Sequence, residues 1–142
     1  MLAPYYKLPF RFGDAIQQKE LAKSSLYDSV TGMIHLIAVT YFGECKHDDT
    51  FGCEIWEHDF ENISNNQQFR ERLIRSIRTT IEKHEKRLTN IQVDIQLEQI
   101  DIMVAMRRIK SRISLRVKGT LVATNEQFSH FDQFFIGPLS YY

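Results

Sequence analysis

The hydrophobic period of this chain changes once, near Asn90, and this change constrains the fold more than any other feature. Before it, two stretches repeat apolar residues every three to four positions, which predicts two amphipathic helices. After it, Ile91, Val93, Ile95 and Leu97 alternate with polar residues, which predicts a strand with one wet face. The order predicts an α+β domain, in which two helices pack on a small antiparallel sheet of about three strands.

The first helix is predicted to begin near Ser24 or Ser25, because Ser25 followed three residues later by Asp28 resembles a capping box at a helix N-terminus. Leu36 and Val39 widen its apolar stripe, so we expect this helix to be buried on more than one side. Gly43 is the natural residue to stop it. The stripe itself consists of Leu26, Val30, Met33, Ile34, Ile37, Ala38 and Tyr41.

The second helix is predicted over residues 67–87, and its two surfaces differ in chemistry. The apolar stripe contains Phe69, Leu73, Ile77, Ile81 and Leu88, and the opposite surface carries Arg70, Arg72, Arg75 and Arg78. A helix face of this kind is usually solvated. The alternative is a docking surface for an acidic partner, because arginine is favoured at interfaces.

Two further strands are expected, one ending near Lys118 and one in the aromatic run from Phe128 to Ile136. Residues 99–108 could extend the first strand or form a crossing loop, and Gly119 is expected to mark a bulge. The cations between Arg107 and Lys118 raise nucleic-acid binding as a hypothesis. Acids of the first strand can pair with several of them, and these strands lack an RNA-binding aromatic signature, so we disfavour it.

Residues 1–22 show no clean period, and Pro4 and Pro9 resist helix formation. Their apolar content is too high for a free tail. We expect an extended N-terminal arm that packs on the domain or on a partner, followed by a single domain over residues 23–142. A chain of 142 residues is long enough for one domain with a sizeable core.

Composition argues against several classes of function. The formal net charge is zero, so no overall field favours nucleic acid or an anionic membrane. Two cysteines do not make a disulfide framework, no signal segment opens the chain, and no apolar run could span a bilayer. These observations predict a cytoplasmic protein with reduced thiols.

The densest chemistry lies in residues 42–60, FGECKHDDTFGCEIWEHDF. A zinc site could be built from Cys45, His47, Cys53 and His58, but their spacing matches no familiar zinc module, so we expect neither a metal nor a cofactor. We interpret this segment as a packing and docking motif, in which glycines allow tight turns and large apolar groups anchor it.

The more serious enzymatic alternative is a pair of carboxylates for glycoside hydrolysis. Candidates are Glu44, Asp48, Asp49, Glu54, Glu57, Asp59 and Glu61, together with Glu85 near the end of the second helix. Acids gathered in one loop more often reflect solvated turns and ion pairs. Arg87 beside Glu85 favours an ionised carboxylate, which is unsuitable for a general acid.

Together these features resemble the phage baseplate-wedge, lysozyme-like family, which includes the TssE-type baseplate subunits of type VI secretion systems. The resemblance covers roughly residues 24–136. It rests on Gly43 and Glu44 after the first helix, Phe51 and Gly52 before an aromatic and acidic turn with Trp56, and Glu85 and Arg87 at the end of the second helix. The family usually has Glu-Pro-Arg where this chain has Glu85-Lys86-Arg87. The stretches FGCEIWEHDF and FFIGPLSYY resemble the Bacteroidetes subtype.

The resemblance implies a structural, non-enzymatic role in a contractile apparatus. It implies a fold like the strand-rich handshake part of sheath subunits, and partners of two kinds: TssF-like and TssG-like wedge subunits, and the contractile sheath. It implies a cytoplasmic location within a membrane-docked baseplate, and a polar pair of Glu85 and Arg87 that fixes the helix end and contacts partners. The alternative is a small carboxylate-dependent peptidoglycan hydrolase.

Overall fold

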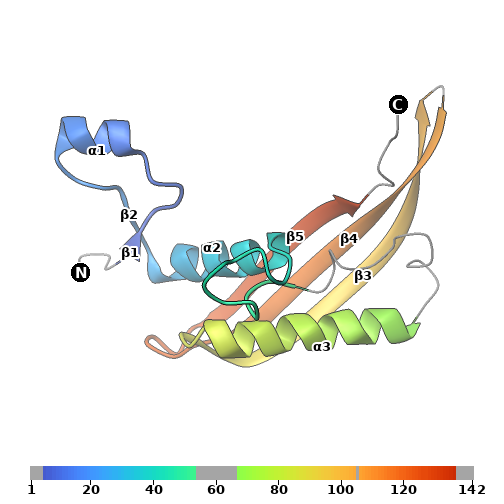
Figure 1. Ribbon diagram of the computed structural model, residues 1–142. Helices are drawn as coiled ribbons and strands as arrows, with labels where there is room; N and C mark the ends of the chain where they lie inside the picture. The colour runs from blue at the N-terminus through green and yellow to red at the C-terminus, as the bar shows by residue number, and fades with distance from the viewer. Residues whose placement is uncertain (1–4, 54–66, 105, 137–142) are drawn as a thin grey trace.

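The computed structural model describes residues 5–53, 67–104 and 106–136 (Figure 1). The elements are β1 (Tyr5–Tyr6), α1 (Phe12–Gln18), β2 (Lys23–Ser24), α2 (Leu26–Val39), α3 (Gln67–His84), β3 (Leu88–Val104), β4 (Met106–Leu121) and β5 (Gln127–Ile136). β1 pairs with β2, and the larger antiparallel sheet has the order β3-β4-β5. The predicted α+β class and the three-stranded antiparallel sheet are confirmed.

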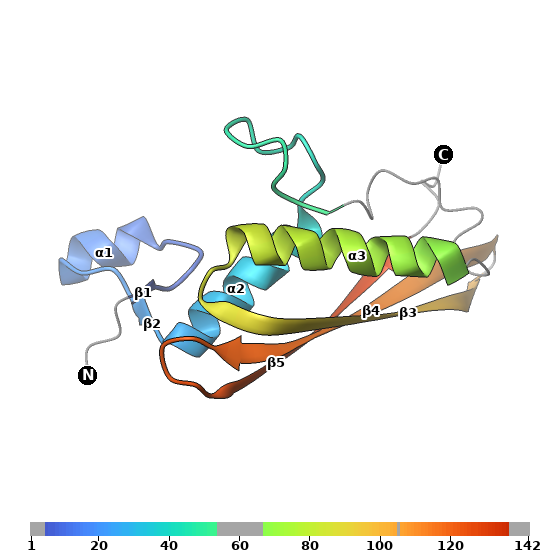
Figure 2. The ribbon, with the colours of Figure 1, turned by 90° about the horizontal axis from the view of Figure 1, so that it is seen from below.

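The two long helices, α2 and α3, cover one face of the larger sheet (Figure 2). The core is built from inward-facing aliphatic rows, among them Val30, Ile34 and Ile37 on α2, Leu73, Ile77 and Ile81 on α3, and Ile113, Leu115 and Val117 on β4. Each such side chain contributes about 1.5–3 kcal/mol when it is fully buried. The predicted helical and alternating periods therefore place most of the core where we expected it, although Tyr41 of the predicted stripe is exposed.

The start of α2 is as predicted, but its end and its burial are not. The Ser25 side chain accepts a hydrogen bond from the Asp28 backbone N–H at 3.1 Å. The helix ends at Val39, because Thr40 turns to an extended conformation before Gly43 is reached. Leu36 and Val39 are exposed, so the expected burial on more than one side was wrong. The sheet and α3 cover one side of α2 only (Figure 2).

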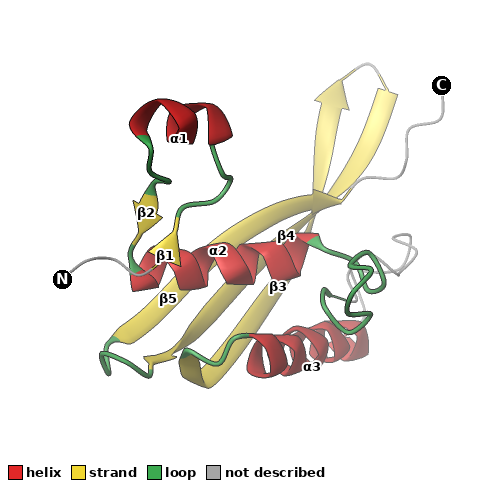
Figure 3. Ribbon diagram, turned by 60° about the vertical axis from the view of Figure 1, so that its left-hand side comes forward, coloured by secondary structure: helices red, strands yellow, loops and turns green. Residues whose placement is uncertain are grey.

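The first strand is longer than its alternating segment, since residues 99–104 continue β3. Pairing of β4 with β5 ends at Ser111 and Ile136, so residues 106–110 of β4 pair with β3 beyond the end of β5. The two strands form a projecting ribbon (Figure 3). The bulge that Gly119 was expected to mark is present: Asn90 and Ile91 of β3 lie opposite this glycine, between the Thr89–Thr120 and Gln92–Lys118 pairs.

Gly119 lies on the facing strand, β4, directly opposite that bulge. A Cβ at this position would lie 2.8 Å from the Thr89 carbonyl oxygen, closer than side chains tolerate. Asn90, inside the bulge, has a positive φ of 53°. The glycine therefore permits a close backbone approach, which is the other usual reason for glycine in a strand.

Some of the cations on β4 and some of the arginines on α3 form ion pairs with acids of β3. Arg112 pairs with Glu98, its neighbour across β3 and β4. Asp94 faces Arg116 in the sheet register, but its carboxylate binds Arg70 of α3 at 2.7 Å. The Arg116 guanidinium instead lies over the Phe131 ring, 5.5 Å from its centroid.

We expected an extended N-terminal arm, but the arm is extended only in part. It contains α1, and β1 runs antiparallel to β2 with Tyr5 opposite Ser24. Both prolines precede Phe12, so neither obstructs this helix. No residue from 5 to 25 is buried, and α1 lies away from the large sheet (Figure 1). The boundary between an arm over 1–22 and a domain over 23–142 stays a prediction.

None of the helices among the described residues combines the length and apolar character needed to cross a bilayer.

Candidate functional site

Glu85 and Arg87 form a forked ion pair where α3 gives way to β3. Arg87 Nε donates to Glu85 Oε1 at 2.8 Å, and Nη2 donates to Oε2 at 2.7 Å. The Arg87 backbone N–H also donates to Oε1, at 3.1 Å. Only 2% of the Glu85 side chain is exposed, against 26% for Arg87. A buried carboxylate needs such partners, because an unpaired charge in the interior is costly.

Arg87 extends this pair into a joint between several elements. Its Nη1 donates to Ser29 Oγ of α2 at 2.8 Å, and its guanidinium lies 4.7 Å from the centroid of the Tyr5 ring. Its carbonyl accepts the Val122 N–H at 2.9 Å, just after β4. One side chain and its backbone thus connect the end of α3, α2, the N-terminal arm and the end of β4.

The electrostatics of the joint favour a fixed charge pair. Hydrogen bonds to the Glu85 carboxylate, more than any other influence, raise the pKa of Arg87 above its ordinary value. Both oxygens of Glu85 already accept hydrogen bonds from Arg87. This arrangement suits a structural tie, because a general acid must hold a transferable proton.

The segment after α2 is a compact turn rather than an open pocket. Gly43 and Gly52 adopt positive φ values of 85° and 128°. A Cβ on Gly52 would lie 2.7 Å from the Thr40 carbonyl oxygen, where Cys53 N–H donates at 2.8 Å. Both glycines therefore hold positions that other residues adopt only with strain.

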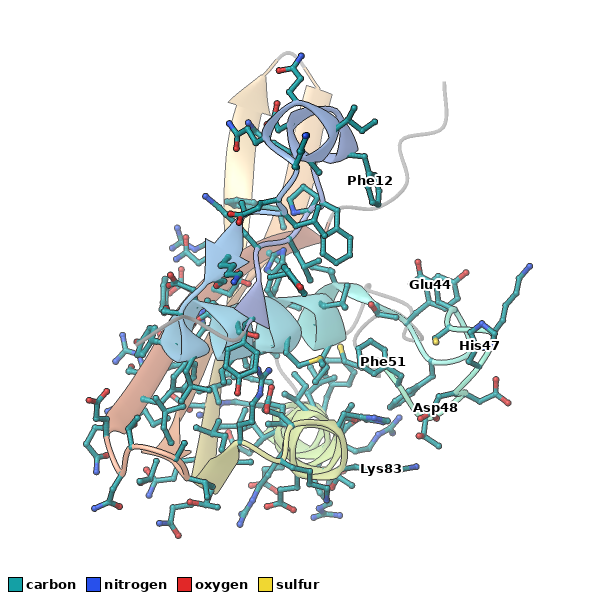
Figure 4. All side chains as sticks on the ribbon, turned by 90° about the vertical axis from the view of Figure 1, so that its left-hand side faces the viewer. Phe12, Glu44, His47, Asp48, Phe51 and Lys83 are labelled. Atoms are coloured by element: carbon teal, nitrogen blue, oxygen red, sulfur yellow. The ribbon has the colours of Figure 1, made fainter. Side chains whose placement is uncertain are left out.

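Phe51 anchors this turn against the helices. Its half-buried ring packs against the core and meets His84 of α3 edge-on, with centroids 5.1 Å apart. Glu44 and His47 lie on the outer part of the loop, whereas Phe51 lies close to the helices (Figure 4). The predicted anchoring role of Phe51 agrees with this geometry. Trp56, the other predicted anchor, lies outside the described residues.

The acids of this turn bind mainly close neighbours, although Asp48 Oδ2 also lies 3.7 Å from His84 Nε2 of α3. The Glu44 carboxylate accepts the Tyr41 N–H at 3.1 Å. Asp48 accepts hydrogen bonds from Thr50, which lower the pKa of its carboxyl group. A depressed pKa favours the ionised form, which is unsuitable for a general acid. Glu54, Glu57, Asp59 and Glu61, the remaining candidates of this segment, lie outside the described residues.

The cysteines and histidines do not converge in the part of the chain that is described. Cys53 is fully buried, with its thiol 3.6 Å from the Ala38 carbonyl oxygen, whereas Cys45 is half-buried in the turn. Residues 5–53, 67–104 and 106–136 contain no group of three or more side chains suited to a metal ion. His58 lies outside these ranges.

A cavity of about 630 Å³ lies between part of this turn and α3. Phe42 and Thr50 line it from the turn, and Arg75, Thr79 and Lys83 line it from the helix. Asp49 is the one carboxylate among its described lining residues, whereas hydrolysis of a glycosidic bond requires two.

Comparisons with known proteins identify a family and a similar fold. A family model described as "Baseplate wedge protein gp25" matches residues 24–126. The fold is similar to a crystal structure of a candidate tail lysozyme from Geobacter sulfurreducens, with a TM-score of 0.61, 19% sequence identity, and 85% of this chain and 100% of that chain covered. At this identity the likeness concerns the fold alone. No curated protein matches the chain by sequence.

The family match spans both glycines of the turn, the Glu85–Arg87 joint and most of the sheet. The chain belongs to the gp25 family of baseplate wedge proteins.

Proposed function

We propose that this chain is a structural, non-enzymatic baseplate component of a type VI secretion apparatus. In this proposal it joins wedge subunits of the TssF and TssG type and seeds the contractile sheath from the cytoplasmic side of a membrane-docked baseplate. Membership of the baseplate wedge family supports a role alongside other baseplate proteins. The choice of this secretion apparatus rests on the resemblance of the sequence to TssE-type subunits.

The observation that carries the proposal is the β3–β4 ribbon. Residues 106–110 of β4 pair with β3, beyond the last residue paired with β5 (Figure 3). Two strands by themselves are marginally stable in water, so a projecting ribbon gains most from added strands. A partner strand that joins its edge would supply main-chain hydrogen bonds along its whole length.

The body of the sheet differs from the ribbon, because the helices reach its edge strands there. Arg70 of α3 donates to the Ile95 carbonyl of β3 at 2.5 Å, and Tyr27 of α2 donates to the Ser129 carbonyl of β5. Side chains laid over edge strands are a usual protection against unwanted pairing. We therefore propose that a strand of the sheath subunit adds to the edge of the ribbon and not to the body of the sheet.

The experiment shortens the ribbon without disturbing the core. Glu98 and Arg112 face each other in register, so residues 99–111 can be replaced by Asn-Gly, which forms a two-residue hairpin turn. The full chain and this variant are co-expressed with wedge subunits and a sheath subunit. We expect the variant to retain the wedge subunits and to lose the sheath subunit.

The matched control replaces Ser129 by Ala in the body of the sheet, where the Tyr27 contact is to the backbone carbonyl and persists. Thermal unfolding of both variants tests that the fold is intact. Sheath capture by the shortened chain at the wild-type level would overturn the role of the ribbon. A wild-type chain that captures neither kind of subunit would overturn the proposed function as a whole.

The hydrolase alternative has its own test. Glu85 is held by Arg87 and Asp48 by Thr50, and these contacts favour roles in structure over proton transfer. We expect purified peptidoglycan to be left intact by the wild-type chain. Turnover that disappears in a Glu85→Gln or Glu54→Gln variant would contradict the non-enzymatic proposal.

A further inference from the structure

The N-terminal arm carries a row of large apolar side chains in water. We call these residues the aromatic strip: Tyr6, Leu8, Phe10, Phe12 and Ile16. Their exposed fractions run from 44% for Phe10 to 79% for Ile16. Single exposed apolar residues are ordinary, but a contiguous group marks a surface that another molecule covers.

The strip is ordered internally, although no part of the arm is buried. The Tyr6 and Phe10 rings meet edge-on at 6.5 Å, and the Phe10 and Phe12 rings lie 5.8 Å apart. Such a cluster presents a large contact area at a low entropic cost, because its rings are already held together.

The first described residues of the arm attach it to the domain and so fix where the strip begins. Tyr5 packs on Arg87, and the Lys7 N–H donates to the Ala22 carbonyl at 2.8 Å, alongside the β1–β2 pairing. The strip therefore begins at the Glu85–Arg87 joint. Phe12 lies well apart from Phe51 and Lys83 of the domain (Figure 4).

The charges of the arm indicate what it fits. Apolar residues occupy every even position from 6 to 12, and Lys7 and Arg11 fall between them. Residues 5–24 carry Lys7, Arg11, Lys19 and Lys23 against Asp14 and Glu20, although the whole chain is neutral. A complementary surface would be apolar in its centre and acidic at its rim.

We propose that the aromatic strip docks into an apolar groove with an acidic rim on a neighbouring wedge protein. This inference rests on the proposed function and adds a second point of attachment to it. The strip precedes residue 24, where the family match begins, so it extends the interface beyond the shared wedge fold.

Two other occupants fit the charges less well. A second copy of the chain would present an arm with the same excess of positive charge, and like charges repel. An anionic membrane favours a strongly cationic face, whereas Asp14 and Glu20 lie within the arm. Both occupants are outcomes that the experiment can detect.

The test compares two pairs of exposed apolar residues in the full chain, co-expressed with the TssF-like and TssG-like wedge subunits. The arm variant is Phe10→Ser with Phe12→Ser, and the matched control is Leu36→Ser with Val39→Ser on α2. We expect the arm variant to weaken capture of the wedge subunits by about tenfold or more, because aromatic anchors dominate interfaces. A Lys7→Glu and Arg11→Glu variant should weaken capture in the same direction.

Thermal unfolding should be unchanged in the arm variant, because both rings are exposed. Equal capture by the arm variant and the wild-type chain would overturn the inference and leave the proposed function standing. Absence of capture by the wild-type chain would overturn both. Flotation of the wild-type chain, but not of the arm variant, with vesicles of phosphatidylcholine and phosphatidylglycerol would overturn it in favour of a membrane. A wild-type dimer that the arm variant turns into a monomer would overturn it in favour of a second copy.

Discussion

The turn over residues 41–53 and the Glu85–Arg87 joint use polar side chains in opposite ways. In the turn, Glu44 and Asp48 bind Tyr41 and Thr50, residues two or three positions away. In the joint, Arg87 contacts Ser29, 58 residues earlier, and the ring of Tyr5. The turn is rich in reactive residue types, and its acids bind mainly close neighbours, although Lys83 of α3 donates to Thr50 at 2.6 Å and His84 lies 3.7 Å from Asp48. The joint has few charged groups, and they connect distant elements.

This difference teaches that the number of polar and reactive residues in a segment is a poor guide to how much that segment contributes to stability. An exposed acid that binds its neighbour can be lost at little cost, because water replaces the contact. A buried carboxylate held by one arginine cannot, because loss of the arginine leaves a charge without a partner. The following substitutions test this contrast.

The largest effect is expected for Arg87→Met. The change leaves Glu85, which is 2% exposed, without its partner, and also removes the bond to Ser29. We expect the free energy of unfolding to fall by about 3–5 kcal/mol, as when other buried pairs are broken. Urea unfolding measures this loss. A fall of less than about 1 kcal/mol would place the joint in the class of surface ion pairs.

A smaller effect is expected at the two glycines of the turn, and it should differ between them. Both have positive φ, but a Cβ on Gly52 would lie 2.7 Å from the Thr40 oxygen, whereas one on Gly43 meets nothing within 4 Å. Gly52→Ala should therefore cost more than Gly43→Ala, for which strain alone accounts for about 1 kcal/mol. Equal losses in urea unfolding would show that the close approach at Gly52 relaxes freely.

A third polar cluster, in which Asp132 of β5 lies between His35 of α2 and His130 of β5, should respond to pH. Burial lowers the pKa of His130 below 6.5, and its Nε2 lies 3.5 Å from Asp132 Oδ2. The unfolded chain then binds a proton at higher pH than the folded chain, so stability falls as pH drops through about 6.5. Urea unfolding at several pH values should show this decline in the wild type and a weaker decline in His130→Gln. Identical pH dependence in both would refute the assignment to His130.

The smallest effect is expected for Glu44→Gln. The carboxylate is exposed and accepts one hydrogen bond from the Tyr41 N–H, which an amide oxygen can also accept. We expect a change of about 0.5 kcal/mol or less in the free energy of unfolding. A loss as large as that of Arg87→Met would remove the contrast between the turn and the joint.

The sequence predicted the parts of the fold that depend on local pattern. The Ser25 cap, the aliphatic rows and the antiparallel strands follow from spacing alone, and Glu85 and Arg87 are close enough in sequence to pair. Ser29 and Tyr5 could not be foreseen as partners of Arg87, because a single sequence carries no signal for contacts between distant segments. Helix α1 was missed because two prolines dominated the interpretation of the arm, although both precede it.

Tertiary context also explains the errors at α2. Leu36 and Val39 have the right residue types for a core, but only one side of the helix meets the sheet and α3. Hydrophobic pattern gives the apolar width of a helix, and the neighbouring elements decide how much of it is covered.

The most direct test of the joint is a double-mutant cycle that combines Arg87→Met with Glu85→Leu. Each single variant and the double variant are unfolded in urea, and the coupling free energy is the departure from additivity. We predict that the double variant is more stable than Arg87→Met alone, because Glu85→Leu removes the carboxylate that would otherwise lie buried and unpaired. Losses that simply add would contradict the claim that these two residues act as one structural joint.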